Sequence, residues 1–501
     1  MMSFFGVFVL ILIVLLLIFF HFYYWCGIRV RRLISSIPGY TETESWAFSY
    51  EAAILPTEGV LSFLEKVFGK HTSLCSMWFL GVPYVNLSSP GNLEALLKSV
   101  QHITKGREYF ILVPWLGDGL LTSTGAKWHA HRKMLTPAFH FRILESCLPI
   151  FNRNAQLLIK ILQDNFADEK ILNVDTFISL CSLDIISEAA MGVRLEAQLQ
   201  KHSTLEYVNG VKRMGQLCLN RGKSFYLVKD WVYSLTPEGR EQKRLLNMLH
   251  SFTENVIKEC KHKRMVAKEN GTTDQQPTAF VDILLEMSEN EPGLFTDVEI
   301  REEVDTFIFE GHDTTSASIS WSLLLLGHDQ TVQEKAYNEL CSIFGNSDRP
   351  ATKQDLTKMI YLEAVIKESL RLYPPVSYMS RTLDSDLKLE KHIVPAGANV
   401  LFIPYLLHRQ SQLYPDPEKF DPDRFLKLDT NRHPFMYIPF SGGPRNCIGQ
   451  RFAMMEMKVI ISHILRHFRV QAVTKREGLK LIFSPILKPM DGIYVTLYKR
   501  S

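Results

Sequence analysis

The sequence predicts a mainly α-helical protein with minor β-structure, carried on a single N-terminal transmembrane helix. Three observations support this prediction. One long apolar run opens the chain, helical patterns dominate the remainder, and the tail from Lys480 to Tyr498 is typical of short strands and a hairpin. The 501 residues are 46% hydrophobic and 22% charged. This composition supplies enough apolar material for a large core and excludes a disordered or collagen-like chain.

The charge balance and the cysteine content exclude further classes of protein. The formal net charge is only +3, whereas a protein that binds nucleic acid by neutralising phosphates normally has a larger or strongly clustered positive excess. The eight cysteines include no C-x-x-C pair, which argues against a disulfide scaffold or a cysteine-rich zinc domain. We therefore expect no nucleic-acid partner.

The N-terminus is predicted to be an uncleaved transmembrane signal-anchor that covers residues 1–28. Phe4 to Phe20 are apolar apart from one glycine, an aromatic stretch follows, and Arg29, Arg31 and Arg32 end the run. About 25 helical residues are long enough to cross the hydrocarbon core of a bilayer. No positive residue precedes the run, so the arginines are expected on the cytosolic side. A cleaved signal peptide is the alternative, but a basic first region and a small-x-small cleavage site are both missing.

The remainder is predicted to be one cytosol-facing body, residues 41–501. A basic, proline-containing linker, residues 29–40, joins it to the anchor. No tandem repeat and no extended low-complexity tract divides this body. The stretch from Lys258 to Pro277 is rich in lysine and then polar, and we interpret it as a surface connection within the body.

Three helices are predicted from their start and stop signals. The longest begins at Thr296 with a Thr-x-x-Glu capping box, and its helical periodicity continues to about Gly327. A second covers Tyr361 to Tyr373 and is ended by two consecutive prolines. A third begins just after Cys447 and continues to about Phe468.

The strongest chemical signal is the segment Phe440-Ser-Gly-Gly-Pro-Arg-Asn-Cys-Ile-Gly449. Its glycine-rich turn places Cys447 at the start of the following helix, where main-chain N–H groups and the helix dipole favour a thiolate. Arg445 places a cation two residues away, where it can meet an acidic group of a ligand. A lone thiolate among backbone donors is what an axial iron ligand requires. The alternative is an ordinary buried cysteine beside a helix cap.

This segment resembles the haem-ligand loop of the cytochrome P450 haem-thiolate monooxygenases, F-x-x-G-x-R-x-C-x-G, at every position. The similarity extends over almost the whole chain, and membrane-bound members of that family carry the same kind of anchor. The resemblance implies the P450 fold, with a large helical domain and a small β-rich region, and haem b held by Cys447 as the proximal iron ligand. The chain has no G-x-G-x-x-G fingerprint after a strand, so we expect no flavin or nicotinamide site in it.

Glu368 and Arg371 lie three residues apart on the second predicted helix. A local salt bridge is the simplest interpretation. Because they precede the cysteine loop and are followed by Arg424 in an Asp-Arg-Phe sequence, the three residues resemble the Glu–Arg–Arg structural triad of the family. That resemblance implies a structural role in locking the core behind the haem, and no catalytic role.

The longest predicted helix contains Glu310, Asp313 and Thr314 near its middle. Their spacing predicts one polar face on an otherwise apolar helix, which is costly to bury unless the groups are used or well paired. A satisfied buried network is the alternative. The resemblance identifies this stretch as the oxygen-activation segment, in which Asp313 supplies protons and Thr314 hydrogen-bonds the oxygen.

Glu310 departs from most of the superfamily, which has alanine or glycine at this position. The surrounding string resembles family 4, the fatty-acid omega-hydroxylase group, in many of whose members this glutamate forms an ester with a haem methyl group. Such a tether would stiffen the pocket and help to confine reaction to the end of a chain. An unlinked acid that faces the pocket is the alternative.

Trp128 and Arg132 are spaced for one face of a helix. They resemble the haem-propionate donors of the family, and the resemblance adds Arg445 as a third donor and Arg381 as a fourth. It also places the substrate-facing loops around residues 110–120, 205–230, 374–380 and 483–487.

The resemblance implies an O₂-dependent monooxygenase and, more specifically, terminal (omega) hydroxylation of a fatty acid or related long-chain lipid. A haem-thiolate isomerase or dehydratase acting on lipid peroxides is one alternative, and a membrane-anchored haem sensor without turnover is another. Both alternatives need no acid–alcohol pair, so the presence of Asp313 and Thr314 argues against them.

Partners and location follow from the same resemblance. Electrons are expected from NADPH-cytochrome P450 reductase, with cytochrome b5 as a second candidate donor. The substrate is expected to be a lipophilic small molecule. The anchor implies a single-pass protein of the endoplasmic reticulum membrane, in contact with the lipid bilayer and with its catalytic domain in the cytosol.

Overall fold

The computed structural model describes residues 27–79, 81–166, 168–200, 202–223, 227, 229–270, 279–290, 295–426 and 432–500. Nearly all of the predicted signal-anchor, residues 1–28, therefore lies outside the described residues. In the part of the chain that the structure describes, no helix combines the length and the apolar character needed to cross a membrane.

The described chain is mainly helical with small β-sheets, as the sequence predicts. Residues 27–35 are helical. The helices that follow are α2 (Glu42–Ile54), α3 (Val60–Phe68), α4 (Pro90–Leu97), α5 (Val113–Leu116), α6 (Gly125–Leu135), α7 (Phe141–Ser146), α8 (Leu148–Phe166), α9 (Val174–Met191), α10 (His202–Lys223), α11 (Asp230–Ser234), α12 (Pro237–Glu269), α13 (Phe280–Asn290), α14 (Asp297–His328), α15 (Gln330–Phe344), α16 (Lys353–Lys358), α17 (Ile360–Leu372), α18 (Pro404–Leu407) and α19 (Gln450–His467).

The strands form small sheets. They are β1 (Leu74–Phe79), β2 (Val82–Leu87), β3 (Asp168–Asn173), β4 (Met379–Thr382), β5 (Leu387–Lys388), β6 (Ile393–Val394), β7 (Asn399–Phe402), β8 (Phe468–Ala472), β9 (Leu481–Phe483), β10 (Leu487–Pro489) and β11 (Tyr494–Lys499). One sheet has the order β1-β2-β7-β4, in which only β2 and β7 are parallel, and another has the order β3-β11-β8. The β9–β10 hairpin and β11 confirm the predicted strands of the tail.

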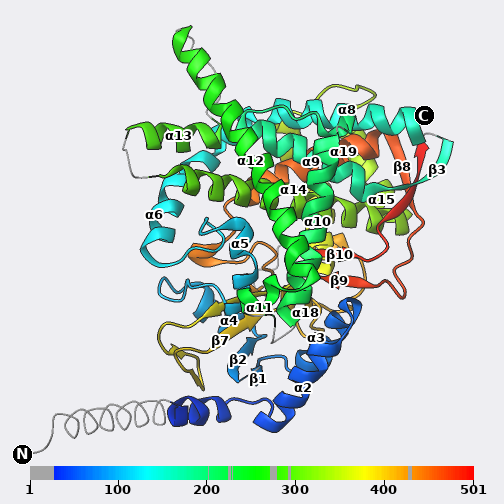
Figure 1. Cartoon of the computed structure of the whole chain (residues 1–501). Helices are drawn as coiled ribbons and strands as arrows, with labels where there is room; N and C mark the ends of the chain where they lie inside the picture. The colour runs from blue at the N-terminus through cyan, green and yellow to red at the C-terminus, as the bar shows by residue number, and fades with distance from the viewer. Residues whose placement is uncertain are drawn as a thin grey trace, which may run out of the picture.

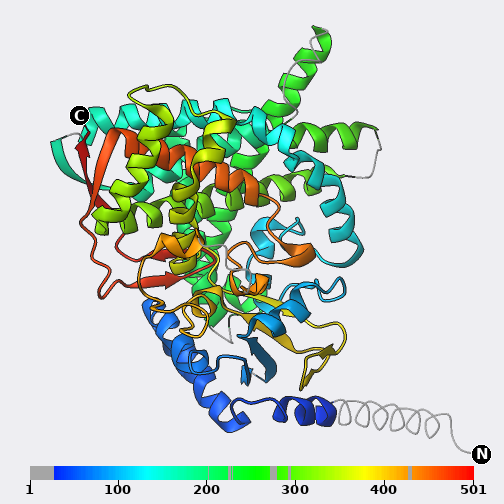
Figure 2. The same ribbon diagram turned by 180° about the vertical axis from the view of Figure 1, so that it is seen from behind.

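Helix α14 runs through the middle of the molecule. Figure 1 shows it among α8, α9, α12 and α19, whereas β1, β2 and β7 lie with α4 in a separate region, and the view from behind shows the same division (Figure 2). The largest apolar cluster includes α14 side chains, such as the fully buried Trp321, together with side chains of α9, α17 and α19. Packing on all sides explains why this helix is apolar around most of its circumference.

The three helices predicted from start and stop signals are confirmed as α14, α17 and α19. At the start of α14, the Glu299 N–H donates to Thr296 Oγ1 at 3.2 Å and the Glu299 carboxylate accepts from the Thr296 main chain at 2.9 Å, so the capping box is complete. This cap fixes where a helix of more than thirty residues begins.

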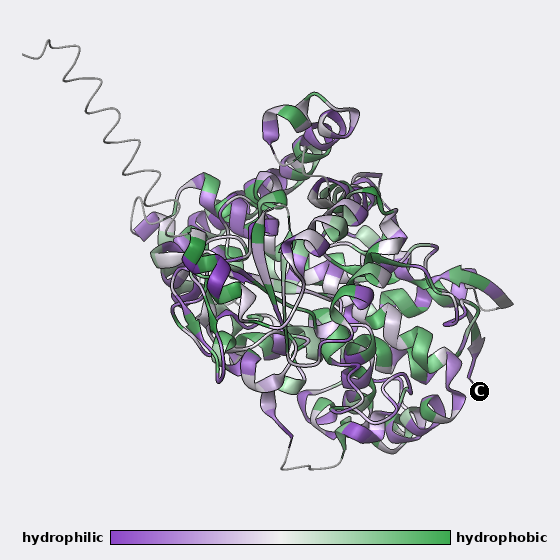
Figure 3. Cartoon of the chain, turned by 90° about the horizontal axis from the view of Figure 1, so that it is seen from below, coloured by the Kyte–Doolittle hydropathy of each residue, from purple (hydrophilic) through white to green (hydrophobic). Residues whose placement is uncertain are grey.

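The predicted surface connection from Lys258 to Pro277 is wrong for its first part. Helix α12 continues to Glu269, because Val256, Ile257 and Cys260 form a buried stripe on one side while lysines and glutamates occupy the other. Figure 3 shows the same alternation of hydrophilic and hydrophobic residues along many peripheral helices. The charged residues in this stretch form the solvent-exposed face of a helix. Lysine and glutamate are good helix formers, so such a stretch can continue a helix.

Candidate functional site

The cysteine loop is a tight structure that ends at α19. The Cys447 N–H donates to the Phe440 carbonyl at 2.9 Å, and the Asn446 N–H donates to the Gly443 carbonyl at 3.1 Å. Gly443 has a φ of +68°, and a Cβ at this position would lie 1.7 Å from the Leu97 carbonyl oxygen. Only glycine fits there, so the glycine of the motif is required by a main-chain contact with the end of α4.

The Cys447 side chain has accessible surface although protein surrounds it, because it faces an internal space. Burial raises the pKa of its thiol to about 12, and the nearby Glu310 carboxylate acts in the same direction. The Gly449 N–H and the Arg132 guanidinium oppose this shift, but they do not outweigh it. The Gly449 N–H thus favours the thiolate, as predicted, but burial is the larger effect. A bound cation such as iron is needed to deprotonate a thiol in this setting.

Four basic residues, Lys105, Arg132, Arg381 and Arg445, lie near Cys447, near Glu310 or near one another. Arg132 donates to the Asn446 carbonyl and side chain at 2.9 and 2.8 Å, and the Arg445 guanidinium lies 4.5 Å from the centre of the Trp128 ring. Arg445 otherwise donates to main-chain carbonyls, for example that of Ile103 at 3.0 Å. Trp128 is buried on α6, and its ring packs against the Arg445 guanidinium. The structure thus brings together Trp128, Arg132 and Arg445, as the sequence predicts.

Arg381 completes the predicted set, and Lys105 is an addition that sequence analysis missed. The main chains of the two residues pair in an isolated β-bridge. Burial lowers the pKa of Lys105, Arg381 and Arg445, with that of Arg445 at about 9, and repulsion from neighbouring arginines adds to the shift for Lys105 and Arg445. Among the described residues, none of the four forms an ion pair with a carboxylate. Four desolvated cations without anionic partners suit a ligand that carries carboxylates.

Glu310 and Thr314 lie on one side of α14 and border a small cavity of about 70 Å³. The Thr314 hydroxyl donates to the Glu310 carbonyl at 2.6 Å. Burial raises the pKa of the Glu310 carboxyl to about 7, against the opposing attraction of Lys105. The other side chains around this cavity are mostly aliphatic and aromatic and include Tyr109, Ile111, Leu112, Leu121, Phe309, Val376, Tyr378, Pro485 and Ile486. Three of the four expected substrate-facing loops therefore contribute to it.

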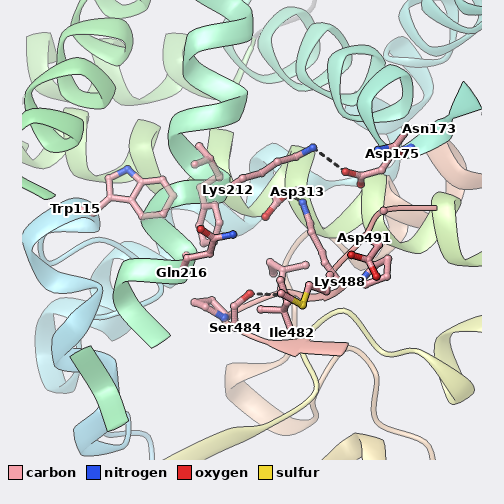
Figure 4. Close-up of a pocket in the computed structure, with 18 residues that line it drawn as sticks. Trp115, Asn173, Asp175, Lys212, Gln216, Asp313, Ile482, Ser484, Lys488 and Asp491 are labelled. Atoms are coloured by element: carbon pink, nitrogen blue, oxygen red, sulfur yellow. Dashed lines mark hydrogen bonds and ion pairs between the residues drawn. The ribbon is translucent and has the colours of Figure 1, made fainter. Parts of the chain in front are cut away.

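Asp313 does not share that side of the helix, which corrects the prediction of a single polar face. It is only 5% exposed and borders a larger cavity of about 230 Å³ on the neighbouring side of α14. There it forms an ion pair with Lys488 of the β9–β10 hairpin (Figure 4). The physical reason is geometric, since consecutive residues on a helix point about 100° apart and Asp313 precedes Thr314.

The predicted structural triad comes together in the core. The Arg371 guanidinium contacts the Glu368 carboxylate at 2.7 and 2.8 Å, and both side chains are fully buried. Arg424 lies 3.4 Å from the same carboxylate. Glu368 also accepts the Asp421 N–H at 2.9 Å, and Arg371 donates to the His408 carbonyl at 2.9 Å. These bonds tie α17 to the chain segment that leads into the cysteine loop.

A second buried pair, which sequence analysis missed, links α6 to α14. His131 Nδ1 lies 2.7 Å from Glu303 Oε1, and Glu303 also accepts the Leu120 N–H at 3.1 Å. The pair fixes the helix that carries Trp128 and Arg132 against the helix that carries Glu310. No sequence spacing links residues that are 172 positions apart.

Comparison with known proteins identifies this arrangement. A model of the family described as Cytochrome P450 matches residues 45–497. The chain belongs to the cytochrome P450 family.

Several relatives of this P450 carry family 4 names. The chain is 46% identical over 451 residues to cytochrome P450 4V2 of Homo sapiens, covering 88% of this chain and 85% of that protein. It is 42% identical over 453 residues to cytochrome P450 4c3 of Drosophila melanogaster, with 87% and 84% covered. It is 40% identical over 478 residues to cytochrome P450 4c21 of Blattella germanica, with 94% and 95% covered. This P450 is therefore a monooxygenase of the family 4 group that uses haem iron.

The residues present fit that cofactor. Cys447 offers a sulfur to an internal space, and the cation cluster of Lys105, Arg132, Arg381 and Arg445 lacks anionic partners among the described residues. A group with a metal ion and two carboxylates, such as haem b, satisfies both features at once.

Proposed function

We propose that this P450 hydroxylates the terminal (omega) carbon of a fatty acid or a related long-chain lipid. The observation that carries this proposal is the size and lining of the small cavity. It measures about 70 Å³ and is lined mostly by apolar side chains, with Glu310 and Thr314 of α14 among them. A small site admits the end of an alkyl chain more easily than its middle, so geometry selects the terminal carbon over weaker internal C–H bonds.

Each residue has a distinct role in this proposal. Cys447 would hold the haem iron through its sulfur. Trp128, Arg132, Arg381 and Arg445 would hold the propionates, together with Lys105. Haem b, when bound, supplies the iron at which O₂ is activated.

The polar residues of α14 supply and hold protons. The Thr314 hydroxyl already makes a hydrogen bond to the Glu310 carbonyl and is oriented at the cavity wall. Asp313, one residue earlier, is the acid that brings protons from the larger cavity. Tyr109, Phe309 and Tyr378 help to keep bulk water from the small cavity. Glu368, Arg371 and Arg424 are structural and hold the core behind the site.

Glu310 is proposed to form an ester with a haem methyl group, in which a methyl C–H bond is broken, the carboxylate oxygen bonds the methyl carbon, and the two electrons are taken up by O₂ during turnover of the enzyme. Its support is the position of Glu310 in the lining of the small cavity. Acid–organic extraction tests this point. Haem should stay with the wild-type chain and leave the Glu310→Ala variant, and extractable wild-type haem contradicts the ester.

The electron supply and the location are also proposals. We propose NADPH-cytochrome P450 reductase as the donor, with cytochrome b5 as a second donor, and residues 1–28 as an anchor in the endoplasmic reticulum membrane. Residues 29–40 then form the linker, and residues 41–501 the cytosolic catalytic domain.

The function is tested in two stages. A strongly red-shifted Soret band in the reduced, carbon-monoxide-bound protein is expected for a thiolate ligand, and Cys447→Ala should abolish it. The reconstituted enzyme is then given NADPH, O₂ and saturated fatty acids of increasing chain length. Omega-hydroxy products support the proposal. Conversion of lipid hydroperoxides without NADPH or O₂ would instead support an isomerase and refute it.

A further inference from the structure

Four charged side chains from four separate elements meet in the larger cavity beside α14. Asp313 comes from α14, Asp175 from α9, Lys212 from α10 and Lys488 from β10. Lys488 is ion-paired with Asp313, and Lys212 Nζ lies 2.7 Å from Asp175 Oδ2. Figure 4 shows the two lysines entering the same space between the two carboxylates. We call this set the charge quartet.

Lys488 is attracted by both carboxylates of the charge quartet. Although burial opposes the shift, Asp313 and Asp175 together raise the pKa of Lys488. Burial likewise opposes the lowering of the Asp175 pKa, which Lys488 and Lys212 bring about together. Two cations and two anions sum to zero, so Lys488 can change partner without adding net charge to the interior. A second arrangement, in which Lys488 pairs with Asp175 and Asp313 is released, would leave the net charge of the interior unchanged.

Two other buried titratable groups near Asp313, His312 and Tyr207, are neutral. Burial lowers the pKa of His312, whose Nδ1 lies 2.8 Å from the Ile308 carbonyl, so its ring is neutral. Burial also raises the pKa of Tyr207, on α10, well above its ordinary value. Asp491 borders the same cavity beyond the hairpin. Among the described residues, Lys488 is thus the cation that is ion-paired with Asp313 and can hold or release its side chain.

The hairpin that carries Lys488 also borders the substrate cavity. Pro485 and Ile486 line both cavities, and Lys488 is two residues further along. Between them, the Leu487 carbonyl accepts the Trp321 indole N–H of α14 at 3.1 Å. A substrate that presses on Pro485 or Ile486 therefore acts on a short, anchored segment whose other end is the Lys488 side chain.

We propose that Lys488 is a positioning residue for proton delivery. While it is paired with Asp313, it holds that side chain in the larger cavity, away from Thr314. Substrate contact with the hairpin moves Lys488 towards Asp175, and the released Asp313 side chain is then free to relay protons from the cavity towards Thr314. This inference rests on the proposed function, because it assigns a control to the same reaction.

Four variants of the full-length, haem-loaded enzyme test the proposal, with product formed per electron measured as a function of pH. Lys488→Met leaves a buried carboxyl without its cation, so the pH profile should move to higher pH by about one unit or more. Lys488→Arg keeps the charge and should restore the wild-type profile. Asp175→Asn removes the second partner, so product per electron should fall several-fold at an unchanged midpoint. Lys480→Met, an exposed lysine beside the hairpin, is the matched control and should change nothing.

A second measurement needs no substrate and no turnover. In an infrared difference spectrum between neutral and alkaline pH, Lys488→Met should gain the carboxylic acid band of a buried protonated carboxyl, and the added change Asp313→Asn should remove that band. If Lys488→Met only lowers thermal stability, with the pH profile and the band unchanged, Lys488 is a structural strut and the proposal fails. The infrared measurement does not require the enzyme to accept fatty acids. It therefore tests the role of Lys488 separately from the proposed hydroxylation.

Discussion

Replacing Glu456 with glutamine should remove a pH dependence from the stability of this P450. Glu456 lies on α19, directly after the cysteine loop, and its side chain is fully buried. Burial raises the pKa of its carboxyl to about 8, and among the described residues only the Ser182 hydroxyl opposes this shift. The native state therefore holds a neutral carboxyl, while the unfolded chain has a carboxyl of ordinary acidity.

The size and sign of the effect follow from proton linkage. Between the ordinary pKa of 4.5 and the native pKa of about 8, the unfolded state binds fewer protons than the native state. The stabilisation that protonated Glu456 gives the native state is thus complete below a pH of about 4.5. It then falls by about 1.4 kcal/mol per pH unit until the pH reaches about 8. The total loss is about 5 kcal/mol, a large part of the stability of an ordinary domain.

The assay is urea unfolding of the wild type, Glu456→Gln and Glu477→Gln, at about pH 5 and about pH 9. Other titrating groups are shared, so the difference between variants isolates Glu456. Relative to wild type, Glu456→Gln should gain about 4 kcal/mol between the two pH values, because part of the total of about 5 kcal/mol is already lost at about pH 5, while Glu477→Gln, at an exposed position, should gain nothing. An equal difference at both pH values would mean that native Glu456 is charged, and the reasoning would be refuted.

Three further predictions concern the site. Gly443→Ala should lose the red-shifted carbon-monoxide band and at least about 2 kcal/mol of stability, because its Cβ would strike the Leu97 carbonyl; Gly345→Ala has a similar φ but open space and should keep the band. Arg445→Leu should reduce the haem retained after gel filtration several-fold, and unchanged haem content would contradict the role of the cation cluster. Thr314→Ala should retain haem but form less product and more peroxide per electron, and an unchanged product yield would contradict its role in proton transfer.

Local signals predicted much of the fold. The capping box at Thr296, the prolines after Tyr373 and the glycine turn before Cys447 each fix a helix boundary within a few residues, so α14, α17 and α19 could be placed from sequence. The continuation of α12 was missed because charged residues mark both loops and solvated helix faces, and only the buried stripe at Val256, Ile257 and Cys260 separates the two.

The site was predictable where a motif carries it and unpredictable where the fold alone brings residues together. Cys447 and Arg445 share one short segment. Lys105 belongs to no motif, and it joins the arginines only through the β-bridge to Arg381. Lys488 reaches Asp313 across 175 positions. The motif shows the donors that favour a Cys447 thiolate, but it does not show how completely protein surrounds the sulfur, and this burial raises the thiol pKa.

The unpaired cations around the internal space have a consequence for the life of the protein in a cell. Lys105 and Arg445 are both buried and both repelled by neighbouring arginines, so binding of a dianion at this cluster should stabilise the folded chain. Ligand binding stabilises a native state in proportion to ligand supply. Chains that find no haem should therefore be removed by cellular proteases, and the abundance of this enzyme should follow haem synthesis more closely than its own rate of translation.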